Sequence, residues 1–272
     1  MTERMTIEVD GRQASYLAAG EQGPVVLLVH GTYWSRVWQP VMDGLAAAGL
    51  RPVAVDLPGL GRSEGELTIE TAAVPALAGW VARFAAALGA EEPLSVAGHD
   101  IGGAVAQHLL AGGEVGVRRL ALVNSVTYDS WPVPGVARFR DPEVVAAVTA
   151  EELLAARRTA VSTALHRPAT EAELADYLDP WNDARVRRSW MALAGAADGR
   201  YTLDLVPALK GDRTPKLLVW GEDDTFQEVR YAERFAAEMP DTSLVRVPGA
   251  GHIPMENDPG AVAGALARFF LG

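Results

Sequence analysis

The chain has 272 residues, of which 49% are hydrophobic and 22% charged, and its formal net charge is −11. This composition is typical of a folded protein, and the length fits one large domain with an insertion. The negative charge argues against nucleic acid as a partner, because proteins that bind it need a basic face. Without any cysteine, covalent catalysis would have to use an oxygen or nitrogen nucleophile.

The sequence offers no segment for targeting to or insertion into a membrane. The first residues contain no basic stretch that leads into an apolar one. No uncharged apolar run reaches the length of about 18 residues that a membrane-spanning helix needs. We therefore expect a cytoplasmic protein without a membrane partner, acting as a monomer or homodimer.

Apolar runs alternate with helical patterns in the first half of the chain. Two short alternating stretches, at 6–9 and 14–18, flank Asp10-Gly11 and predict an opening β-hairpin. Strands are then predicted at 25–29, 52–55, 94–97 and 120–123, with helices that begin near residues 37, 69 and 102. This order, with nearly unbroken apolar strands, predicts an α/β fold: a mostly parallel central sheet with helices on both faces.

The alternation stops after residue 123 and resumes with strands at 215–219 and 243–247 and a helix at 261–269. The segment between is rich in Ala, Glu and Arg, with helical periodicity at 142–163 and 170–178. No Gly/Ser-rich or Pro-rich spacer bounds it, so a second domain on a linker is disfavoured. We interpret 126–213 as an α-helical lid inserted in a core that comprises 1–125 and 214–272.

The strongest chemical signal is Gly98-His99-Asp100-Ile101-Gly102-Gly103, between a predicted strand and a predicted helix. A sharp strand-to-helix turn brings backbone segments together, so small residues are needed on both sides of its central residue. The N-terminus of the following helix would favour the ionised form of the Asp100 carboxyl group. The alternative is that Asp100 only caps the helix, since Asp is common at that position.

Two later strand ends carry possible partners for Asp100. One predicted strand ends before a loop with Asp223 and Asp224, and the last one ends before a loop with His252. The carboxyl ends of parallel strands lie along one edge of a sheet, so these side chains can converge with Asp100. The other four histidines show no spacing typical of a metal site, and we expect no metal.

These motifs resemble those of the α/β-hydrolase superfamily over essentially the whole chain. The resemblance rests on His30-Gly31, on Asp-Leu-Pro-Gly-Leu-Gly-Arg-Ser at 56–63, on the turn around Asp100, and on the two later loops. Within the superfamily, Gly-His-Asp at this turn is similar to epoxide hydrolases and to haloalkane and haloacetate dehalogenases, where most members carry Ser. The resemblance implies a cofactor-independent catalytic triad of Asp100, His252 and Asp224, and its Trp-Gly-x-x-Asp pattern favours Asp224 over Asp223.

A carboxylate nucleophile predicts a particular chemistry. It is already ionised at neutral pH, and it suits displacement at a saturated carbon better than attack on esters. We expect Asp100 to form an alkyl-enzyme ester, which a water activated by His252 then hydrolyses, with Asp224 orienting the imidazole. The resemblance implies that the backbone N–H groups of Thr32 and Ile101 form the oxyanion hole.

The chain differs from the epoxide hydrolases and the dehalogenases at two positions near the predicted site. Tyr33 stands where epoxide hydrolases typically have a proline, and Ile101 stands where the dehalogenases typically have Trp or Arg. The residues expected to bind substrate or leaving group are aromatic, although each could instead serve packing. The residues that could protonate an epoxide oxygen are Tyr128, Tyr177 and Tyr201. Those that could donate an indole N–H to a halide are Trp34, Trp131, Trp181 and Trp190. Together with Tyr33 they would form an apolar pocket for a small hydrophobic molecule.

The sequence therefore favours an epoxide hydrolase, with a haloalkane or haloacetate dehalogenase as the alternative. Two other classes remain open. The chain could be a non-hydrolytic enzyme, a cyclase or lyase in which Asp100 acts as acid or base. It could also be a ligand-binding protein without turnover, since a fold does not fix a function. Covalent labelling of Asp100 would separate the hydrolases from both.

Overall fold

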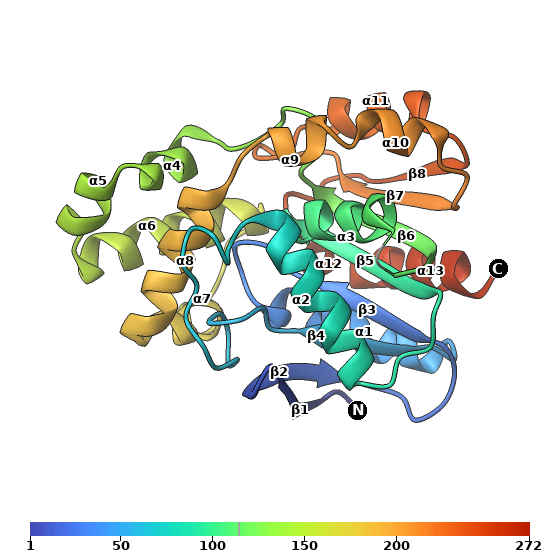
Figure 1. The fold of residues 1–272 in the computed structure, drawn as a ribbon, viewed down its shortest axis with the longest axis horizontal. Helices are drawn as coiled ribbons and strands as arrows, with labels where there is room; N and C mark the ends of the chain where they lie inside the picture. Colours follow the sequence, from blue (N-terminus) through green and yellow to red (C-terminus); the bar gives the residue numbers. More distant parts are fainter. Residues whose placement is uncertain (114) are drawn as a thin grey trace.

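A computed structural model describes residues 1–113 and 115–272 of the chain. In these residues one eight-stranded sheet runs through the molecule, in the order β1-β2-β4-β3-β5-β6-β7-β8 (Figure 1). The strands are β1 (Glu3–Val9), β2 (Arg12–Ala18), β3 (Val25–Val29), β4 (Arg51–Val55), β5 (Leu94–Asp100), β6 (Val117–Ser125), β7 (Lys216–Gly221) and β8 (Thr242–Val247).

The sheet is mostly parallel, as predicted. The hairpin of β1 and β2 is antiparallel, and β2 also pairs antiparallel with β4, whereas every pairing from β4 to β8 is parallel. All residues of β5 and β7 are buried, as expected of strands covered on both faces. The α/β fold expected from the sequence is therefore confirmed.

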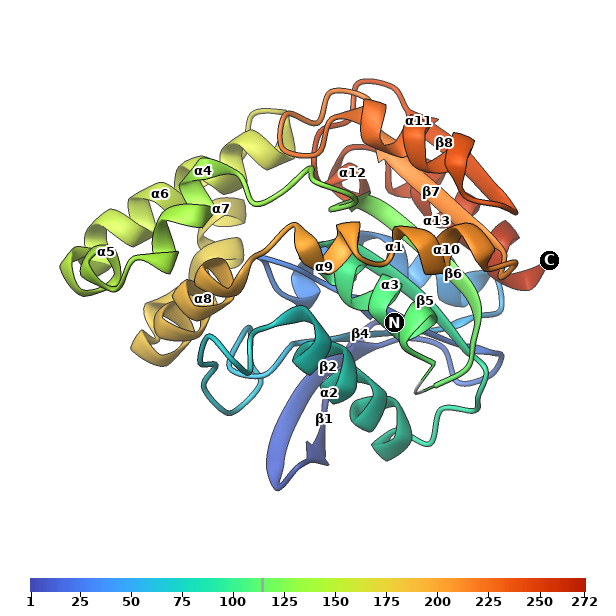
Figure 2. The ribbon, with the colours of Figure 1, turned by 45° about the horizontal axis from the view of Figure 1, so that its top comes forward.

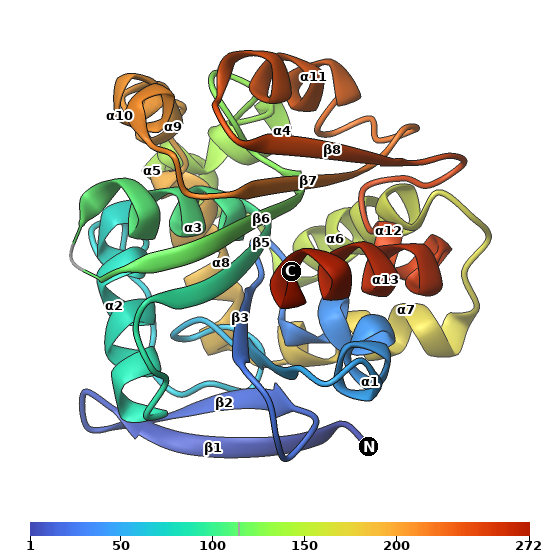
Figure 3. The ribbon, with the colours of Figure 1, turned by 90° about the vertical axis from the view of Figure 1, so that its right-hand side faces the viewer.

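Helices cover both faces of the sheet. On one face α1 (Gln39–Ala47) packs against α13 (Pro259–Leu271), and on the other α2 (Val74–Ala87) packs against α3 (Ile101–Gly112) (Figure 3). Successive residues of β3 enter opposite cores: Val26 and Leu28 pack on the α1 side, and Leu27 and Val29 on the α2 side. This alternation follows from the two-residue repeat of a strand.

The helices between β6 and β7 form two groups. The first group, which we call the cap, stands to one side of the sheet (Figures 1 and 2). The second group lies along the core, where α9 packs against α3. The cap comprises α4 (Pro134–Ala137), α5 (Pro142–Ala147), α6 (Ala150–Leu165), α7 (Glu171–Leu178) and α8 (Ala184–Ala196); the second group comprises α9 (Arg200–Leu203) and α10 (Val206–Gly211).

Some helix boundaries differ from those predicted. The periodic stretch at 142–163 is two helices, because Thr149 and Glu152 form a capping box that starts α6 afresh. The helix expected from residue 69 begins at Val74, one residue before Pro75, which is tolerated only in a first turn. The helix α11 (Val229–Glu238) was not predicted. Within the described residues, no helix combines the length and apolarity needed to cross a membrane.

The turn between β5 and α3 depends on its glycines. A Cβ on Gly98 would stand 2.4 Å from the carbonyl oxygen of Gly102 and 2.5 Å from the Cα of Gly103. A Cβ on Gly102 would stand 2.3 Å from the carbonyl oxygen of Val29. These neighbours are backbone atoms, which cannot rotate away as a side chain can. The glycines therefore let β5 and α3 pack closely enough to present Asp100 at the turn.

Gly98→Ala is expected to destabilise the protein by about 3 kcal/mol, because the added methyl group overpacks backbone on two sides. Urea unfolding would show a lower midpoint with an unchanged slope. Gly112→Ala is the matched control, since a Cβ there meets nothing within 4 Å. It should leave stability unchanged or raise it by up to about 1 kcal/mol. Equal stability of the two variants would contradict the packing argument.

Candidate active site

Asp100 lies at the junction of β5 and α3 in a strained backbone conformation. Its φ is +55°, which is uncommon for a residue other than glycine. Its side chain does not cap α3, so the cap interpretation does not account for this residue. Strain of this kind persists only where the surrounding structure enforces it, and the glycine contacts of the turn do so here.

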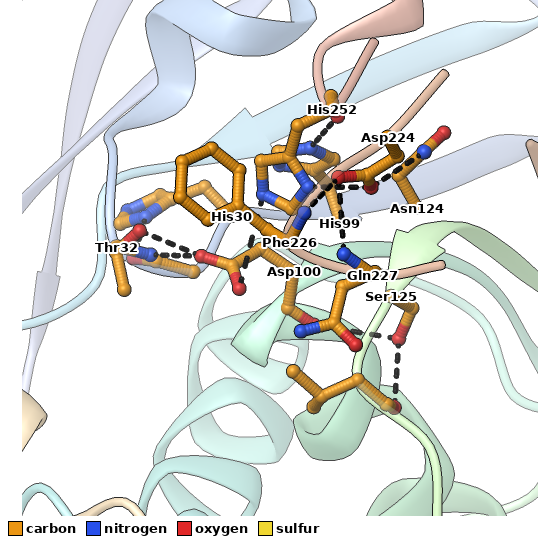
Figure 4. Close-up of polar contacts among 12 residues, drawn as sticks. His30, Thr32, His99, Asp100, Asn124, Ser125, Asp224, Phe226, Gln227 and His252 are labelled. Atoms are coloured by element: carbon orange, nitrogen blue, oxygen red, sulfur yellow. Dashed lines mark hydrogen bonds and ion pairs between the residues drawn. The ribbon is translucent and has the colours of Figure 1, made fainter. Parts of the chain in front are cut away.

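The two oxygens of the Asp100 carboxylate have different surroundings (Figure 4). Oδ2 accepts hydrogen bonds from the backbone N–H of Thr32 at 2.8 Å and from its hydroxyl at 2.7 Å. Oδ1 lies 4.0 Å from Nε2 of His252, too far for a direct hydrogen bond. A Cβ on Gly31 would stand 2.4 Å from the Ile101 nitrogen and 2.6 Å from Oδ2. The N–H groups of Thr32 and Ile101 therefore lie near the same carboxylate.

His252 is held by Asp224, not by Asp223. Nδ1–H of His252 donates to Oδ2 of Asp224 at 2.8 Å, so the lone pair of Nε2 is free toward Asp100. The other oxygen of Asp224 accepts from the backbone N–H groups of Phe226 at 2.7 Å and Gln227 at 3.0 Å. Asp223 instead lies 3.6 Å from His166, at the surface.

Burial and charge act against each other in this pair. Burial disfavours protonated His252, but the charge and hydrogen bond of Asp224 outweigh it and raise the pKa of His252 above its ordinary value. Burial likewise disfavours ionised Asp224, but His252 and the hydrogen bonds of Gln227 and Asn124 outweigh it and lower the pKa of Asp224. Asp224 is therefore a stable anion that strengthens His252 as a base.

Two further histidines pack around the site. The ring of His99 lies 4.8 Å from that of His252, and its Nε2–H donates to the carbonyl oxygen of His252 at 2.8 Å. Burial, with the neighbouring His252, lowers the pKa of His99 to about 4, so His99 is neutral. His30 accepts a hydrogen bond from the backbone N–H of Leu57 at 3.0 Å. His99 thus holds the backbone of His252, and His30 links the loop after β3 to the loop after β4.

A cavity of about 380 Å³ opens beside Asp100 and His252, between the sheet and the cap. Its walls are mostly apolar, which is typical of small-molecule sites. The lining residues are Thr32, Tyr33, Asp100, Ile101, Val126, Trp131, Pro132, Val133, Gly135, Val136, Arg138, Phe139, Leu153, Ala156, Arg157, Ala160, Trp190, Phe226, Gln227 and His252.

Residues 26–265 match the sequence pattern of the alpha/beta hydrolase family. The chain belongs to this family. The resemblance to this superfamily that was inferred from the motifs is thus confirmed.

Among curated proteins, this chain is similar to parts of larger ones. It is 27% identical to polyketide synthase ThaQ of Burkholderia thailandensis over 90% of the chain, which spans 12% of ThaQ. It is 35% identical to the dihydrolipoyllysine-residue acetyltransferase component of the acetoin cleaving system of Cupriavidus necator, over 44% of the chain and 32% of that protein. Epoxide hydrolase 4 of Mus musculus is 26% identical, over 84% of the chain and 67% of that protein.

Solved structures share the fold over nearly the whole chain. The structure of DBJA superposes with a TM-score of 0.84 at 23% identity, covering 99% of this chain and 97% of DBJA. Epoxide hydrolase CorEH gives 0.82 at 23% identity, covering 100% and 99%. A loop variant of the haloalkane dehalogenase DbeA from Bradyrhizobium elkanii gives 0.81 at 23%, covering 100% and 97%.

The structure brings some of the predicted aromatic residues of this chain to the cavity and not others. Tyr33, Trp131 and Trp190 line it, as do Thr32 and Ile101. Five other aromatic residues that were expected to bind substrate do not line it. These five are Trp34, Tyr128, Tyr177, Trp181 and Tyr201.

Each of the five has other contacts that explain its position. The indole N–H of Trp34 donates to the carbonyl oxygen of Tyr177 at 3.1 Å, and the Tyr177 hydroxyl donates to Glu256 at 2.8 Å. The Tyr128 hydroxyl faces Glu238 at 3.4 Å. Trp181 packs against the guanidinium of Arg157, and Tyr201 packs edge-on against His108. Contacts within the cap, within the core and between the two thus account for the positions of these side chains.

Sequence reasoning missed four polar residues of the site. Asn124 donates its side-chain amide to Asp224 at 2.8 Å, and Arg138, Arg157 and Gln227 line the cavity. Asn124 comes at the carboxyl end of a predicted strand, where functional side chains gather, so its position was a usable signal. Arg157 falls midway between Leu153 and Val161, four residues from each, and therefore on the buried face of its helix.

Proposed function

We propose that this hydrolase reacts through a covalent alkyl ester on Asp100 and that its substrates are epoxides. One observation carries the proposal: a carboxylate stands at the strained strand-to-helix turn, with Oδ2 bound by Thr32 and Oδ1 free beside the cavity. An ionised carboxylate needs no base to become nucleophilic. It favours displacement at a saturated carbon over attack on an ester.

In the first step Oδ1 of Asp100 attacks an epoxide carbon, and the carbon–oxygen bond of the ring breaks. The leaving oxygen needs a proton, and Tyr33 is the tyrosine whose side chain lines the cavity among the described residues. Burial raises the pKa of Tyr33 well above its ordinary value, so the hydroxyl keeps its proton until the ring opens. The product of this step is an ester of Asp100 with a neighbouring alcohol.

In the second step water attacks the carboxyl carbon of that ester. Nε2 of His252 takes the proton of the water, and the charged imidazole is stabilised by Asp224. Negative charge develops on Oδ2, where the N–H of Thr32 already donates at 2.8 Å and the N–H of Ile101 lies close. The intermediate then collapses: its bond to the substrate oxygen breaks, and the departing alkoxide takes the second proton of the water, which yields the diol and ionised Asp100. The proton on His252 returns to the phenolate of Tyr33.

The hydrogen bonds of the cavity favour an epoxide over a halide as the leaving group. A halide needs free N–H donors, which indoles could supply. The indole of Trp131 donates instead to the Thr202 hydroxyl at 2.7 Å, and that of Trp190 to the carbonyl oxygen of Thr32 at 3.1 Å. Both indoles on the cavity wall are thus already engaged, whereas the opening epoxide needs only one hydroxyl.

Tyr33→Phe is expected to lower kcat for epoxides by about 10²-fold, the usual effect of losing a general acid. The measurement is steady-state turnover of a panel of epoxides and haloalkanes. Tyr128→Phe is the matched control, because its hydroxyl faces Glu238 outside the cavity. It should keep full activity. Turnover of haloalkanes but not epoxides by the wild type would instead support dehalogenation.

A further inference from the structure

Arg157 is a buried cation on the wall of the cavity. It lies on α6 of the cap and is 5% exposed. Its guanidinium carbon lies 5.1 Å from the ring centre of Tyr33, 5.2 Å from that of Trp181 and 4.7 Å from that of Trp190. Aromatic faces attract a cation, so these rings hold the guanidinium in place. They do not neutralise its charge.

Arg157 uses only part of its hydrogen-bonding capacity, although it also contacts the hydroxyl of Tyr33. Nη2 donates to the carbonyl oxygen of Thr32 at 3.0 Å, and Nε has no acceptor among the described residues. Within the same part of the chain, no Asp or Glu side chain forms an ion pair with it. Burial disfavours the charged form and lowers the pKa of Arg157, an effect that Tyr33 and the negative charge of Asp100 offset only in part. Arg157 is thus a buried cation that the protein balances only in part.

The charges around the cavity have the opposite sign to the protein as a whole. The chain carries a net charge of −11. Yet the lining includes two arginines, Arg138 and Arg157, against one acidic residue, the nucleophile Asp100. Arg138 is exposed, and Arg157 is buried. An anionic molecule would meet a cation at each of these places in the cavity wall.

We propose that Arg157 binds a carboxylate of the substrate, so that the substrates are small carboxylic acids that carry the reactive epoxide. This inference rests on the proposed function for the identity of the reacting group. A guanidinium that is always charged is best paired with a substrate group that is always charged. A leaving group that becomes an anion only when its bond breaks would give Arg157 no ion pair in the enzyme–substrate complex. A carboxylate also matches one guanidinium, whereas a phosphate dianion calls for several donors.

Binding of two unreactive probes of nearly equal shape tests this proposal. The probes are 4-bromobenzoate and 4-bromobenzamide, whose aryl bromide resists displacement by a carboxylate. Isothermal titration of the full-length protein should give at least about tenfold tighter binding of the benzoate, the effect of one charge-assisted hydrogen bond. Arg157→Met keeps the apolar stem but removes the charge, and it should abolish the preference.

Arg158→Met is the matched control, because the neighbouring Arg158 is exposed and pairs with Glu171. It should keep the preference of the wild type. Equal binding of the two probes by the wild type, no binding of either, or a preference that survives Arg157→Met would each overturn the proposal. The last outcome would point to Arg138 instead.

A crystal structure of the wild type with 4-bromobenzoate gives a second test that holds even if Arg157→Met does not fold. The carboxylate should lie within about 3 Å of the Arg157 guanidinium, and the anomalous signal of bromine fixes the orientation. A carboxylate that points away from Arg157 would overturn the proposal. Neither test depends on covalent chemistry at Asp100. A failure here therefore leaves the proposed function standing, and a failure of that function leaves the carboxylate site standing.

Discussion

Replacing His252 with Gln is expected to stop turnover while leaving the first chemical step intact. Oδ1 of Asp100 makes no direct hydrogen bond to His252, so the carboxylate can attack an epoxide without it. A glutamine amide cannot take a proton from water, so the ester should accumulate to one equivalent per chain. Turnover should fall by about 10³-fold, within the range for loss of a general base.

Intact-protein mass spectrometry after mixing with an epoxide would measure the adduct, and peptide mapping would assign it. His166→Gln is the control, because His166 is an exposed histidine that lies by Asp223 at the surface. It should turn over as the wild type does and accumulate no ester. A His252→Gln protein that turns over within tenfold of the wild type, or that gains no adduct, would contradict the two-step account.

Asp100→Asn should lower turnover by at least about 10⁴-fold, because it removes the nucleophile itself. Asparagine has nearly the same size, tolerates a positive φ better than most residues, and can still accept the hydrogen bonds of Thr32. The variant should therefore unfold at close to the temperature of the wild type. Steady-state turnover and thermal unfolding, with the substitution verified by mass, would check both expectations.

The surface variant Asp223→Asn controls for the loss of a negative charge near the strand ends. Asp223 lies at the surface, and Asp224 holds the imidazole of His252. It should retain nearly full activity. If Asp100→Asn kept more than about one hundredth of wild-type turnover, Asp100 would be a structural residue and not the nucleophile.

The positions of Asp100, Asp224 and His252 could be predicted from the sequence because backbone geometry determines where they lie. The glycines around Asp100 indicated the sharp turn. The predicted strands that end before Asp224 and His252 placed both residues at the same edge of the sheet as Asp100. The choice of Asp224 over Asp223 followed from the family pattern alone. The hydrogen bond between Asp224 and His252 agrees with it.

The cavity wall could not be predicted in the same way. Its aromatic residues come from loops of the core as well as from the cap, and the direction of each side chain depends on tertiary packing that no local sequence pattern determines. Tyr177 illustrates this dependence. It lies on the predicted helical stretch, but its hydroxyl donates a hydrogen bond to Glu256 of α12 (Pro254–Asn257), which is far away in the sequence. That contact directs the side chain away from the cavity wall. Arg157 was not predicted to lie in the site, because it is one of two adjacent arginines in a helix and arginine side chains are ordinarily expected to face solvent.

The most direct test of the covalent mechanism is a single turnover of an epoxide, with enzyme in excess, in heavy-oxygen water. Water attacks the carboxyl carbon of the ester, so the label should appear in the peptide that contains Asp100. The diol should carry the original unlabelled oxygen of that residue. Label in the diol and none in Asp100 would mean that water attacks the epoxide directly, and it would contradict the account.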